Sequence, residues 1–381
     1  MQITMHYLSP DQSEIVHLNV ATAILATVLI WFLFRGLNTF WSEIPDHPSN
    51  IHDKPIKRRF LEAYPLMPEG FANYLQTVYY RCVYEYNIIV SANPNIDAGH
   101  SVNHVKKVEE LTFQALKQYY EMKSRSDPTL KTYADTYYGG SESCLEIPMN
   151  AVLRVMIGSL LHEVGDQKFA DKTIKKPKAE IIGKVVTKVL HDYHKYSEEL
   201  KTDIINMIDY CGAATWGDRI PPGSHLYELI IRWADRTEAT GYIGIVRTMT
   251  FSYSKRQTYP LCRDEDEFPT TLDELEHVAP NSRWLSYSNG KKPSESGFSH
   301  YLDKIVHISG QDVPLPYLKE MLNEGQNIVK QFVIDFTTKN NKQFDIDWIL
   351  SHLDPEMYNV EIDQIKEMQQ VMKAEGCKWI K

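Results

Sequence analysis

The sequence contains few cysteines, and they are far apart. Their number is odd, and no two of them form a CxxC pair. Zinc ribbons need closely spaced cysteine pairs, and disulfide-stabilised domains need a dense, even set. The spacing therefore argues against both classes and favours reduced thiols in a domain that faces the cytosol. The five cysteines are Cys82, Cys144, Cys211, Cys262 and Cys377.

Positive charge is also scarce. The chain has 41 Lys and Arg residues against 50 Asp and Glu residues, which gives a formal net charge of -9. Capture of a nucleic acid backbone needs clustered Lys and Arg side chains. The charge balance therefore gives no strong sign of a nucleic-acid-binding protein.

The sequence does contain ample material for a hydrophobic core. Hydrophobic residues make up 43% of the chain and charged residues 24%, as in a globular protein rather than a disordered one. A chain of 381 residues can hold two or three domains, but a helical fold can also fill this length with one extended core. The number of domains stays open at this point.

One long apolar run lies near the N-terminus. The seventeen residues 18–34 carry no charged side chain, and spanning a bilayer takes about 20 apolar residues, with a lower limit near 17. We therefore expect one transmembrane helix over about residues 18–37. The alternative is an apolar helix that packs on the body of the protein.

The flanks of this run predict its orientation. The first 17 residues contain no Lys or Arg, whereas a cleavable signal peptide needs a basic segment there. Positive charge begins at Arg35 and continues within residues 54–59, which favours a cytoplasmic location for the C-terminal side. We expect a single-pass membrane protein whose soluble part lies in the cytoplasm.

The rest of the chain divides into three regions after the N-terminal segment 1–41. Residues 42–95 are expected to form a Pro-rich linker, which ends near residue 70, and a lead-in helix. In residues 96–255 apolar residues recur at helical spacing, so we expect a core of four or five helices. Residues 256–381 begin with a long polar connection and return to helix. Strand-like alternation is scarce, and the expected fold class is all-α.

Ionisable residues follow two of the apolar helices. His162 and Glu163 come directly after the apolar run 151–161, and Asp235 follows a second apolar run. Such groups are costly at the end of a buried helix unless they are paired or bind a metal. Taken singly, each residue also fits a helix cap, an ion pair or a hydrogen-bonded core position.

Three segments taken in order resemble the HD superfamily of metal-dependent phosphohydrolases. They read HSVNHVKKV from His100, LLHEVGDQKF from Leu160 and ADRTEATGYIGIVR from Ala234. They are similar to the patterns HxxxHxxRV, LLHDxxDxKF and ADRLDAxGxxGIAR of uncharacterised bacterial and fungal HD hydrolases. The resemblance covers about residues 96–255. It implies an HD-type helical bundle, here preceded by the expected transmembrane helix and followed by additional helices.

The resemblance also implies a site for one divalent metal ion, with Mn, Mg, Fe and Co all compatible. His104 is preferred to His100 as the first ligand because it stands four residues before Val108, as the ligand does in the family pattern. His100 is then expected beside the site, on the substrate side or behind a ligand. The implied ligands are His104, His162, Glu163 and Asp235.

The same motifs imply residues that act on a small phosphomonoester or a nucleotide. Asp166 matches the family Asp and is a candidate for orienting or deprotonating the attacking water. Lys168 matches the family Lys and is a candidate for neutralising the charge of the transition state. The expected substrate-binding residues, besides His100, are Lys107, Arg236 and Arg247.

Three departures from the family pattern bear on activity. Glu163 replaces the Asp of the doublet, which lengthens the ligand arm by one methylene and can shift the geometry by about an ångström. Lys107 replaces Arg and loses its forked geometry. The segment 206–211 lacks the additional His of two-metal relatives, so one ion is expected. The alternative to catalysis is a degenerate HD domain that binds a nucleotide or a partner protein without turnover.

A literal His-Asp doublet also occurs at residues 191–192, with His194 beside it. It follows another apolar stretch, but the Asp and the Lys-Phe pair of the family motif do not follow it. It also lies farther from His104 than His162 does. We interpret this doublet as the polar end of a surface helix and expect no role for it in metal binding.

Overall fold

The structure, a computed structural model, describes residues 54–93, 96–148, 150–166, 177–193, 197–212 and 216–381. Within these ranges the chain forms helices and no β-strand, so the prediction of an all-α fold is confirmed. An isolated parallel bridge joins Phe344 to Ile380. The chain divides into two compact units, residues 1–77 and 78–381.

The described part of the first unit contains α2 (Lys54–Ala63) and the start of α3 (Glu69–Ala92), which continues into the second unit. Helix α2 lies inside the segment that we expected to be a linker. Its Pro55 is in the first turn, where a missing backbone N–H costs little. The Lys57 Nζ atom lies 2.5 Å from Glu69 Oε1, and Gln76 Oε1 accepts a hydrogen bond from the Lys57 backbone at 3.2 Å.

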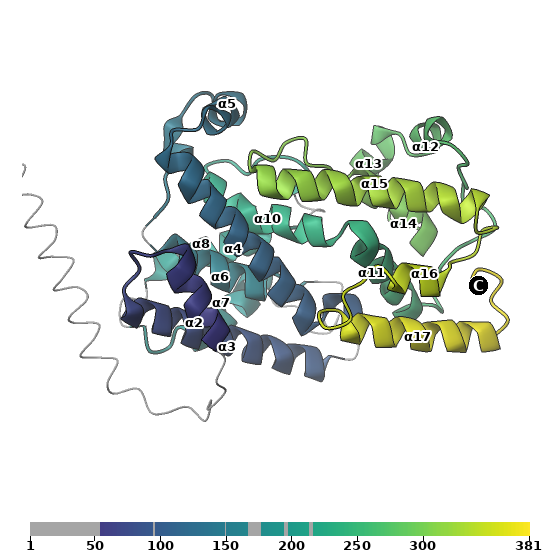
Figure 1. Cartoon of the computed structure of the whole chain (residues 1–381), viewed down its shortest axis with the longest axis horizontal. Coiled ribbons are helices and arrows are strands. Elements are labelled where there is room, and N and C mark those ends of the chain that lie inside the picture. Colours follow the sequence, from purple (N-terminus) through teal and green to yellow (C-terminus); the bar gives the residue numbers. More distant parts are fainter. Residues whose placement is uncertain (1–53, 94–95, 149, 167–176, 194–196, 213–215) are drawn as a thin grey trace, which may run out of the picture. The chain divides into compact units, whose positions relative to one another are not determined.

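After the end of α3, the second unit continues with the elements that carry the expected site residues, among them α4, α6 and α10. Helix α10 packs against α4, α6, α8 and α15 (Figure 1). The bounds are η1 (Ala98–His100), α4 (Val102–Ser124), α5 (Pro128–Tyr137), η2 (Glu142–Leu145), α6 (Ala151–Leu161), α7 (Lys178–Val189), α8 (Glu198–Tyr210), α10 (Leu226–Glu238) and α11 (Gly241–Ser254).

The C-terminal part of this unit is also helical. Its bounds are α12 (Leu272–Val278), α13 (Asn281–Ser288), α14 (Gly297–Asp303), η3 (Ile305–His307), α15 (Pro316–Thr338), α16 (Ile346–Leu350) and α17 (Asn359–Ala374). Helices α12 and α13 lie where the sequence indicated a polar connection. Thr271 caps α12 by accepting from the Glu274 backbone N–H at 3.2 Å, and Trp284 of α13 is buried.

Burial on α4 and α6 follows the apolar spacing of the sequence. The predicted stripe of α4 is buried along its whole length. Every residue of α6 except Arg154 is buried, and Gly158 lets α10 approach closely, because a Cβ at this position would lie 2.6 Å from Ile231 Cδ1. This packing brings the C-terminal end of α6 beside α10. The stripe consists of Val105, Val108, Leu111, Ala115 and Tyr119.

Helix α11 packs against α15, α17 and η1, and it follows α10 after a sharp corner at residues 239–241 (Figure 1). Gly325 of α15 lies against this corner. A Cβ on Gly325 would be 2.2 Å from Thr240 Oγ1 and 3.0 Å from the Gly241 nitrogen. The glycine therefore allows an approach that no side chain would permit.

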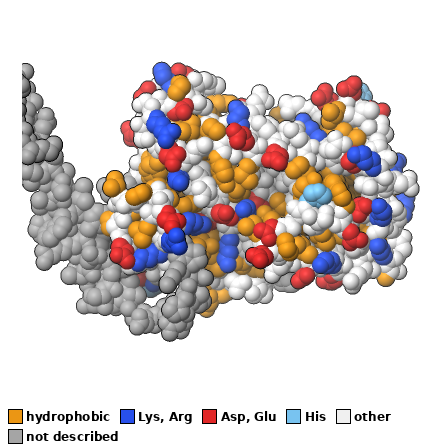
Figure 2. All heavy atoms as spheres, in the orientation of Figure 1, with side chains coloured by type: hydrophobic (Ala, Val, Ile, Leu, Met, Phe, Trp, Pro, Cys, Tyr) orange, Lys and Arg blue, Asp and Glu red, His pale blue; other side chains and the backbone are white. Residues whose placement is uncertain are grey.

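Lys and Arg side chains are interspersed with Asp and Glu on the face shown in Figure 2. Exposed pairs at i,i+4 spacing include Glu180–Lys184 at 2.7 Å and Lys131–Asp135 at 3.2 Å. Such exposed pairs contribute only about 0.3–0.5 kcal/mol each. The packing of apolar helix faces therefore determines the fold.

The predicted transmembrane helix at about residues 18–37 lies outside the described residues. In the part of the chain that is described, no helix is both long and apolar enough to cross a membrane.

Candidate metal centre

Two histidines and two carboxylates converge in the second unit. His104 comes from the first turn of α4, His162 and Glu163 from the turn that follows α6, and Asp235 from α10. One potential ligand atom of each residue lies within 4.8 Å of the other three. Asp235 is half-buried and the other three are buried. The structure therefore brings together the four residues that the motifs implied as ligands.

The distances between these atoms fit one metal ion. His104 Nε2 lies 3.1 Å from His162 Nε2 and 3.5 Å from both carboxylates, Glu163 Oε1 and Asp235 Oδ1. His162 Nε2 lies 3.5 Å from Asp235 Oδ1 and 3.8 Å from Glu163 Oε1. Ligands that are about 2.1 Å from a common ion lie roughly 3.0–3.4 Å apart when adjacent and about 4.2 Å when opposite. These residues could therefore hold one divalent ion after small side-chain adjustments.

The turn after α6 orients His162. Its backbone keeps helical angles (φ -62°, ψ -24°), and Gly165 then reverses the chain with φ 76°. The His162 Nδ1–H donates to the Ser159 carbonyl at 2.7 Å. An imidazole that donates from Nδ1 presents the lone pair of Nε2 to a metal. Sequence analysis did not identify Ser159 as a partner.

His104 is oriented by a carboxylate that sequence analysis also missed. Its Nδ1–H donates to Glu238 Oε2 at 3.2 Å, and Glu238 lies three residues after Asp235 on α10. That i,i+3 spacing was the signal that could have identified it, because residues three apart share a helix face. A carboxylate behind a metal-binding histidine fixes the ring and makes it a better ligand.

The electrostatics of the cluster favour a cation. Burial and the charge of Arg247 lower the pKa of His104, but hydrogen bonds with Glu163 and Glu238 outweigh them, so the pKa is raised. Burial raises the pKa of Asp235, but the hydrogen bond and charge of His162 outweigh it and hold this pKa well below its usual value. Both shifts favour positive charge at this point of the protein.

Arg247 is the predicted substrate-binding cation that the structure places beside the cluster. Its Nη2 atom lies 3.2 Å from His104 Nε2 and 3.8 Å from Glu163 Oε1, while Nη1 donates to Glu238 Oε2 at 3.2 Å. Burial lowers the pKa of Arg247, but the charges of Glu238, Asp235 and Glu163 outweigh it and raise this pKa. The guanidinium is therefore charged and fixed among the carboxylates.

His100 lies at the edge of the cluster. Its Nδ1 atom is 3.1 Å from Asp97 Oδ2, and its Nε2 atom is 3.8 Å from Glu163 Oε1. Asp97 is buried and accepts from the Gly99 N–H at 2.9 Å, which caps η1. The structure thus places His104 in the four-residue cluster and His100 beside it. The motif implied the same two positions for these histidines.

Two other predicted substrate-binding residues form ion pairs with carboxylates that do not belong to the four-residue cluster. Lys107 Nζ lies 3.1 Å from Glu110 Oε2. Arg236 Nη1 lies 2.8 Å from Asp218 Oδ1, and its Nη2 donates to the Gly217 carbonyl. Consecutive helix residues differ in direction by about 100°, so Arg236 points away from the site that Asp235 enters.

Only one of the two predicted catalytic residues lies within the described ranges. Asp166 is half-buried, and its backbone N–H donates to the Glu163 carbonyl at 3.2 Å. It therefore belongs to the same turn as His162 and Glu163. Lys168 lies outside the described residues.

The second His-Asp doublet has a different environment. Asp192 receives two hydrogen bonds from Arg81 of α3, at 2.6 and 2.8 Å. His191 is exposed, and its Nδ1–H donates to the Lys188 carbonyl at 2.9 Å. Both residues lie just beyond the C-terminal end of α7. His194 lies outside the described residues.

Comparison with known proteins adds no relative. No family model, no curated protein and no solved structure matches this chain. The chemistry of the cluster must therefore be inferred from its own residues.

Proposed function

We propose that this chain is a metal-dependent phosphohydrolase of the HD type that acts on a small phosphomonoester or a nucleotide phosphate. The main support for the proposal is that His104, His162, Glu163 and Asp235 converge from segments that are distant in sequence. Two imidazoles and two carboxylates suit Mn, Mg, Fe or Co. Their order along the chain is also that of the HD motifs.

A divalent ion held by these four residues would polarise a phosphoryl oxygen and lower the pKa of a bound water. Arg247 would bind the substrate phosphate, because a buried guanidinium offers forked, charge-assisted hydrogen bonds. Asp166 would orient or deprotonate the attacking water from the turn that carries His162 and Glu163. Ser159 and Glu238 would keep the two imidazoles in ligand geometry.

The first test is metal content. Full-length wild type, His162→Ala and His191→Ala are purified, equilibrated with Mn²⁺, and analysed for bound metal. Both histidines follow an apolar helix, which makes His191→Ala a matched control. We expect about one Mn²⁺ per wild-type and His191→Ala chain and a large loss in His162→Ala. A wild type without bound metal would contradict the proposal.

The second test is turnover. Wild type and Glu163→Asp are assayed for hydrolysis of generic phosphoesters and nucleotides in the presence of Mn²⁺. Activity in the wild type that disappears in His162→Ala is the expected result. Activity in Glu163→Asp alone would instead identify the natural chain as a degenerate HD domain, since one methylene separates the two side chains.

Arg247 favours a second candidate function, a binding module without metal. Its guanidinium lies within 3.9 Å of Glu163 and Asp235 and supplies positive charge to the carboxylates. Such a domain would bind a nucleotide or a partner protein without turnover. Wild type that binds a nucleotide equally well with and without a chelator would favour this function.

We also propose that residues 18–37 anchor the protein to a membrane, with the metal site on the cytoplasmic side. The support is the seventeen-residue uncharged run and the positive charge that follows it. Extraction of membranes with alkaline carbonate tests the anchor. Intact protein should stay in the pellet, and its release into the supernatant would contradict the proposal.

A further inference from the structure

Helix α17 is hydrogen bonded to the short segment that leads into His104. Three side chains of α17 take part, and their partners are the first residue of η1, the N-cap residue of α4 and the second residue of α4. Gln364 Oε1 accepts from the Ala98 backbone N–H at 3.0 Å, Glu361 Oε1 accepts from Ser101 Oγ at 2.7 Å, and Asn359 Oδ1 accepts from Asn103 Nδ2 at 3.0 Å.

The Ser101–Glu361 bond fixes the N-terminal cap of α4. Ser101 Oγ accepts from the Asn103 backbone N–H at 3.2 Å, as an N-cap does. A hydroxyl has one hydrogen, and donation of that hydrogen to Glu361 directs the lone pairs of the oxygen toward the helix. Because the acceptor is a carboxylate, this hydrogen bond is stronger than one between neutral groups.

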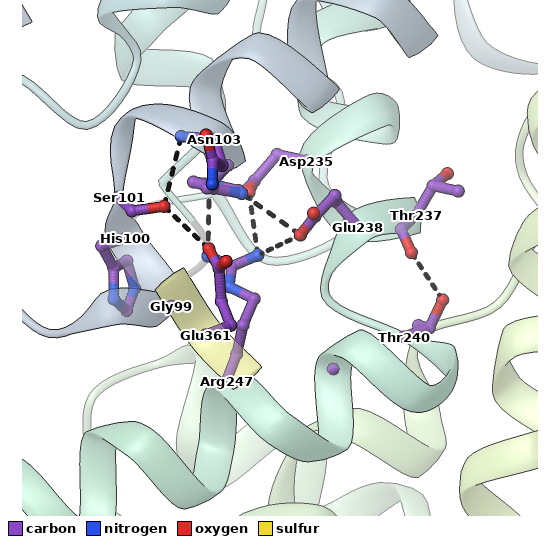
Figure 3. A network of polar contacts seen from close by, with 12 residues as sticks. Gly99, His100, Ser101, Asn103, Asp235, Thr237, Glu238, Thr240, Arg247 and Glu361 are labelled. Carbon is purple, nitrogen blue, oxygen red and sulfur yellow. Dashed lines mark hydrogen bonds and ion pairs between the residues drawn. The ribbon is translucent and has the colours of Figure 1, made fainter. Parts of the chain in front are cut away.

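The cap determines where His104 lies, because His104 is the third residue of α4. The opposite side of the same segment is confined by α11. A Cβ on Gly99 would lie 2.9 Å from Arg247 Cγ and 3.0 Å from Arg247 Cα. Figure 3 shows two contacts in this region, one between Ser101 and Glu361 and one between Arg247 and Glu238.

Burying a carboxylate at position 361 costs free energy unless the group makes favourable interactions. Glu361 is only 1% exposed, and its Oε2 atom has no hydrogen-bond partner among the described residues. Glutamine could accept the same hydrogen bond from Ser101 without bringing a charge into the interior. Burial raises the pKa of Glu361 and the charge of Glu238 raises it further, whereas the hydrogen bond from Ser101 opposes this rise. Ser101 is therefore a main partner of the buried carboxylate.

We propose that Glu361 is a positioning residue of the metal centre, which holds the N-cap of α4 so that His104 faces the other three ligands. The inference rests on the proposed metal site. It makes α17 a structural part of that site, although the family resemblance ended at about residue 255.

The experiment compares full-length wild type with Glu361→Ala, Glu361→Gln and the control Asp363→Asn, an exposed position on the same helix. Hydrogen exchange of the metal-free proteins is measured for residues 97–104, and the Kd for Mn²⁺ is measured by calorimetry. In Glu361→Ala we expect several-fold faster exchange in this segment and at least tenfold weaker Mn²⁺ binding. Glu361→Gln keeps an acceptor for Ser101 and should restore slow exchange and most of the Mn²⁺ affinity, whereas Asp363→Asn should match wild type.

The possible failures are distinct. Wild type that binds no Mn²⁺ overturns the proposed function and this positioning role with it. Wild type that binds Mn²⁺ while Glu361→Ala shows unchanged exchange or an unchanged Kd overturns the inference alone. Equal losses in Asp363→Asn also overturn it, because they reflect the stability of α17 in general. If Glu361→Ala does not fold, Ser101→Ala removes the same hydrogen bond, and a Kd for that variant equal to that of wild type overturns the inference.

Discussion

Each imidazole of the cluster is held by a different kind of acceptor. A backbone carbonyl fixes His162, whereas the Glu238 side chain fixes His104 and also pairs with Arg247. A backbone acceptor cannot be removed by substitution, but a side-chain acceptor can. Glu238 is therefore the residue through which the orientation of a candidate ligand can be altered without removing the ligand itself.

Glu238→Gln is expected to weaken Mn²⁺ binding about 10-fold, because supporting partners of metal ligands typically contribute 10–100-fold to affinity. The glutamine keeps the size of the side chain but removes the charge that stabilises the His104 ring. Calorimetric titration with Mn²⁺ measures the change. The matched control is Glu228→Gln. Glu228 is also buried, lies at the start of the same helix and accepts a hydrogen bond from the His225 N–H at 2.7 Å. An equal affinity in wild type and Glu238→Gln would show that Glu238 does not support the site.

The sequence was enough to identify the four residues of the cluster, because each stands in a motif with a defined order. The residues that contact these four could not be predicted from the sequence in the same way. Ser159 acts through its backbone, which any residue could supply. Glu361 is 260 residues away from the Ser101 that it contacts, so no local spacing could connect them. Arg236 and Arg247 both match motif cations, but only helix geometry distinguishes the one that faces the cluster.

Among the elements, α15 meets the corner between α10 and α11 through Gly325. Asp235 and Glu238 precede this corner and Arg247 follows it, so its geometry determines how these side chains face one another. Position 325 requires glycine for steric reasons. Thr240 Oγ1 and the Gly241 nitrogen already occupy the volume of a Cβ.

Gly325→Ala is therefore expected to lower the free energy of unfolding by about 1–3 kcal/mol, the usual cost of overpacking a core. The higher helix propensity of alanine opposes this loss by only about 1 kcal/mol. Urea denaturation followed by circular dichroism measures the difference. Asn327→Ala, at an exposed position of the same helix, serves as the control and should change stability little. Wild-type stability in Gly325→Ala would mean that the corner has room for a methyl group.

The ion pair between Arg81 and Asp192 connects α3 to the end of α7. Its side chains are only 19% and 18% exposed, so the pair is partly shielded from solvent. Asp192→Asn is expected to lower the free energy of unfolding at pH 7 by about 1–3 kcal/mol, between the values for exposed and buried pairs. A double-mutant cycle with Arg81→Ala measures the coupling. Additive losses would contradict a direct interaction.

The pH dependence of this pair has a defined sign. Burial raises the pKa of Asp192, but the hydrogen bonds and charge of Arg81 outweigh it, so the pKa is lowered. A lowered pKa stabilises the folded state fully above the unfolded carboxyl pKa of about 3.9, and this stabilisation is lost as pH falls through the folded pKa. The stability difference between wild type and Asp192→Asn should therefore shrink below about pH 4. A constant difference down to pH 3 would contradict this account.

The helices that could be predicted from the sequence were those in which apolar residues recur at helical spacing or fill the whole segment. The stripe on α4 and the uniformly apolar α6 are buried as expected. Helices α2, α12 and α13 were not anticipated, because they lie in segments rich in proline and charge. Phe60 of α2 and Trp284 of α13 are buried, but a single apolar residue does not create a periodic pattern that the sequence would reveal.

For the molecule as a whole, a metal that binds the folded chain must also stabilise it. Free Mn²⁺ at 100 times its Kd would add about 2.7 kcal/mol to the free energy of unfolding. We therefore expect a chelator to lower the Tm of wild type by several degrees and to leave the Tm of His162→Ala unchanged. Differential scanning fluorimetry with and without Mn²⁺ measures both. Equal shifts in the two proteins would show that the stabilising ion binds elsewhere.

At this scale the all-α class followed directly from composition and periodicity. The arrangement of residues 256–381 around the core did not, because long-range contacts leave no local trace in the sequence. Helices α15 and α17 pack against α11, which carries Arg247, so this region contributes to the surroundings of the cluster. The membrane anchor stays a prediction, since residues 1–53 lie outside the described residues.

The distance in sequence between the parts of this network has a consequence for biosynthesis. The ribosome releases His104, His162, Glu163 and Asp235 before it makes Glu361, so a nascent chain can carry all four candidate ligands while the N-cap of α4 still lacks its partner. Domains generally begin to fold during synthesis, from the N-terminal side. A premature stop before α17 would then yield a chain that keeps every motif but captures metal poorly. If the proposed metal site exists, its ability to bind an ion would therefore appear late in translation, after Glu361 has been added to the chain.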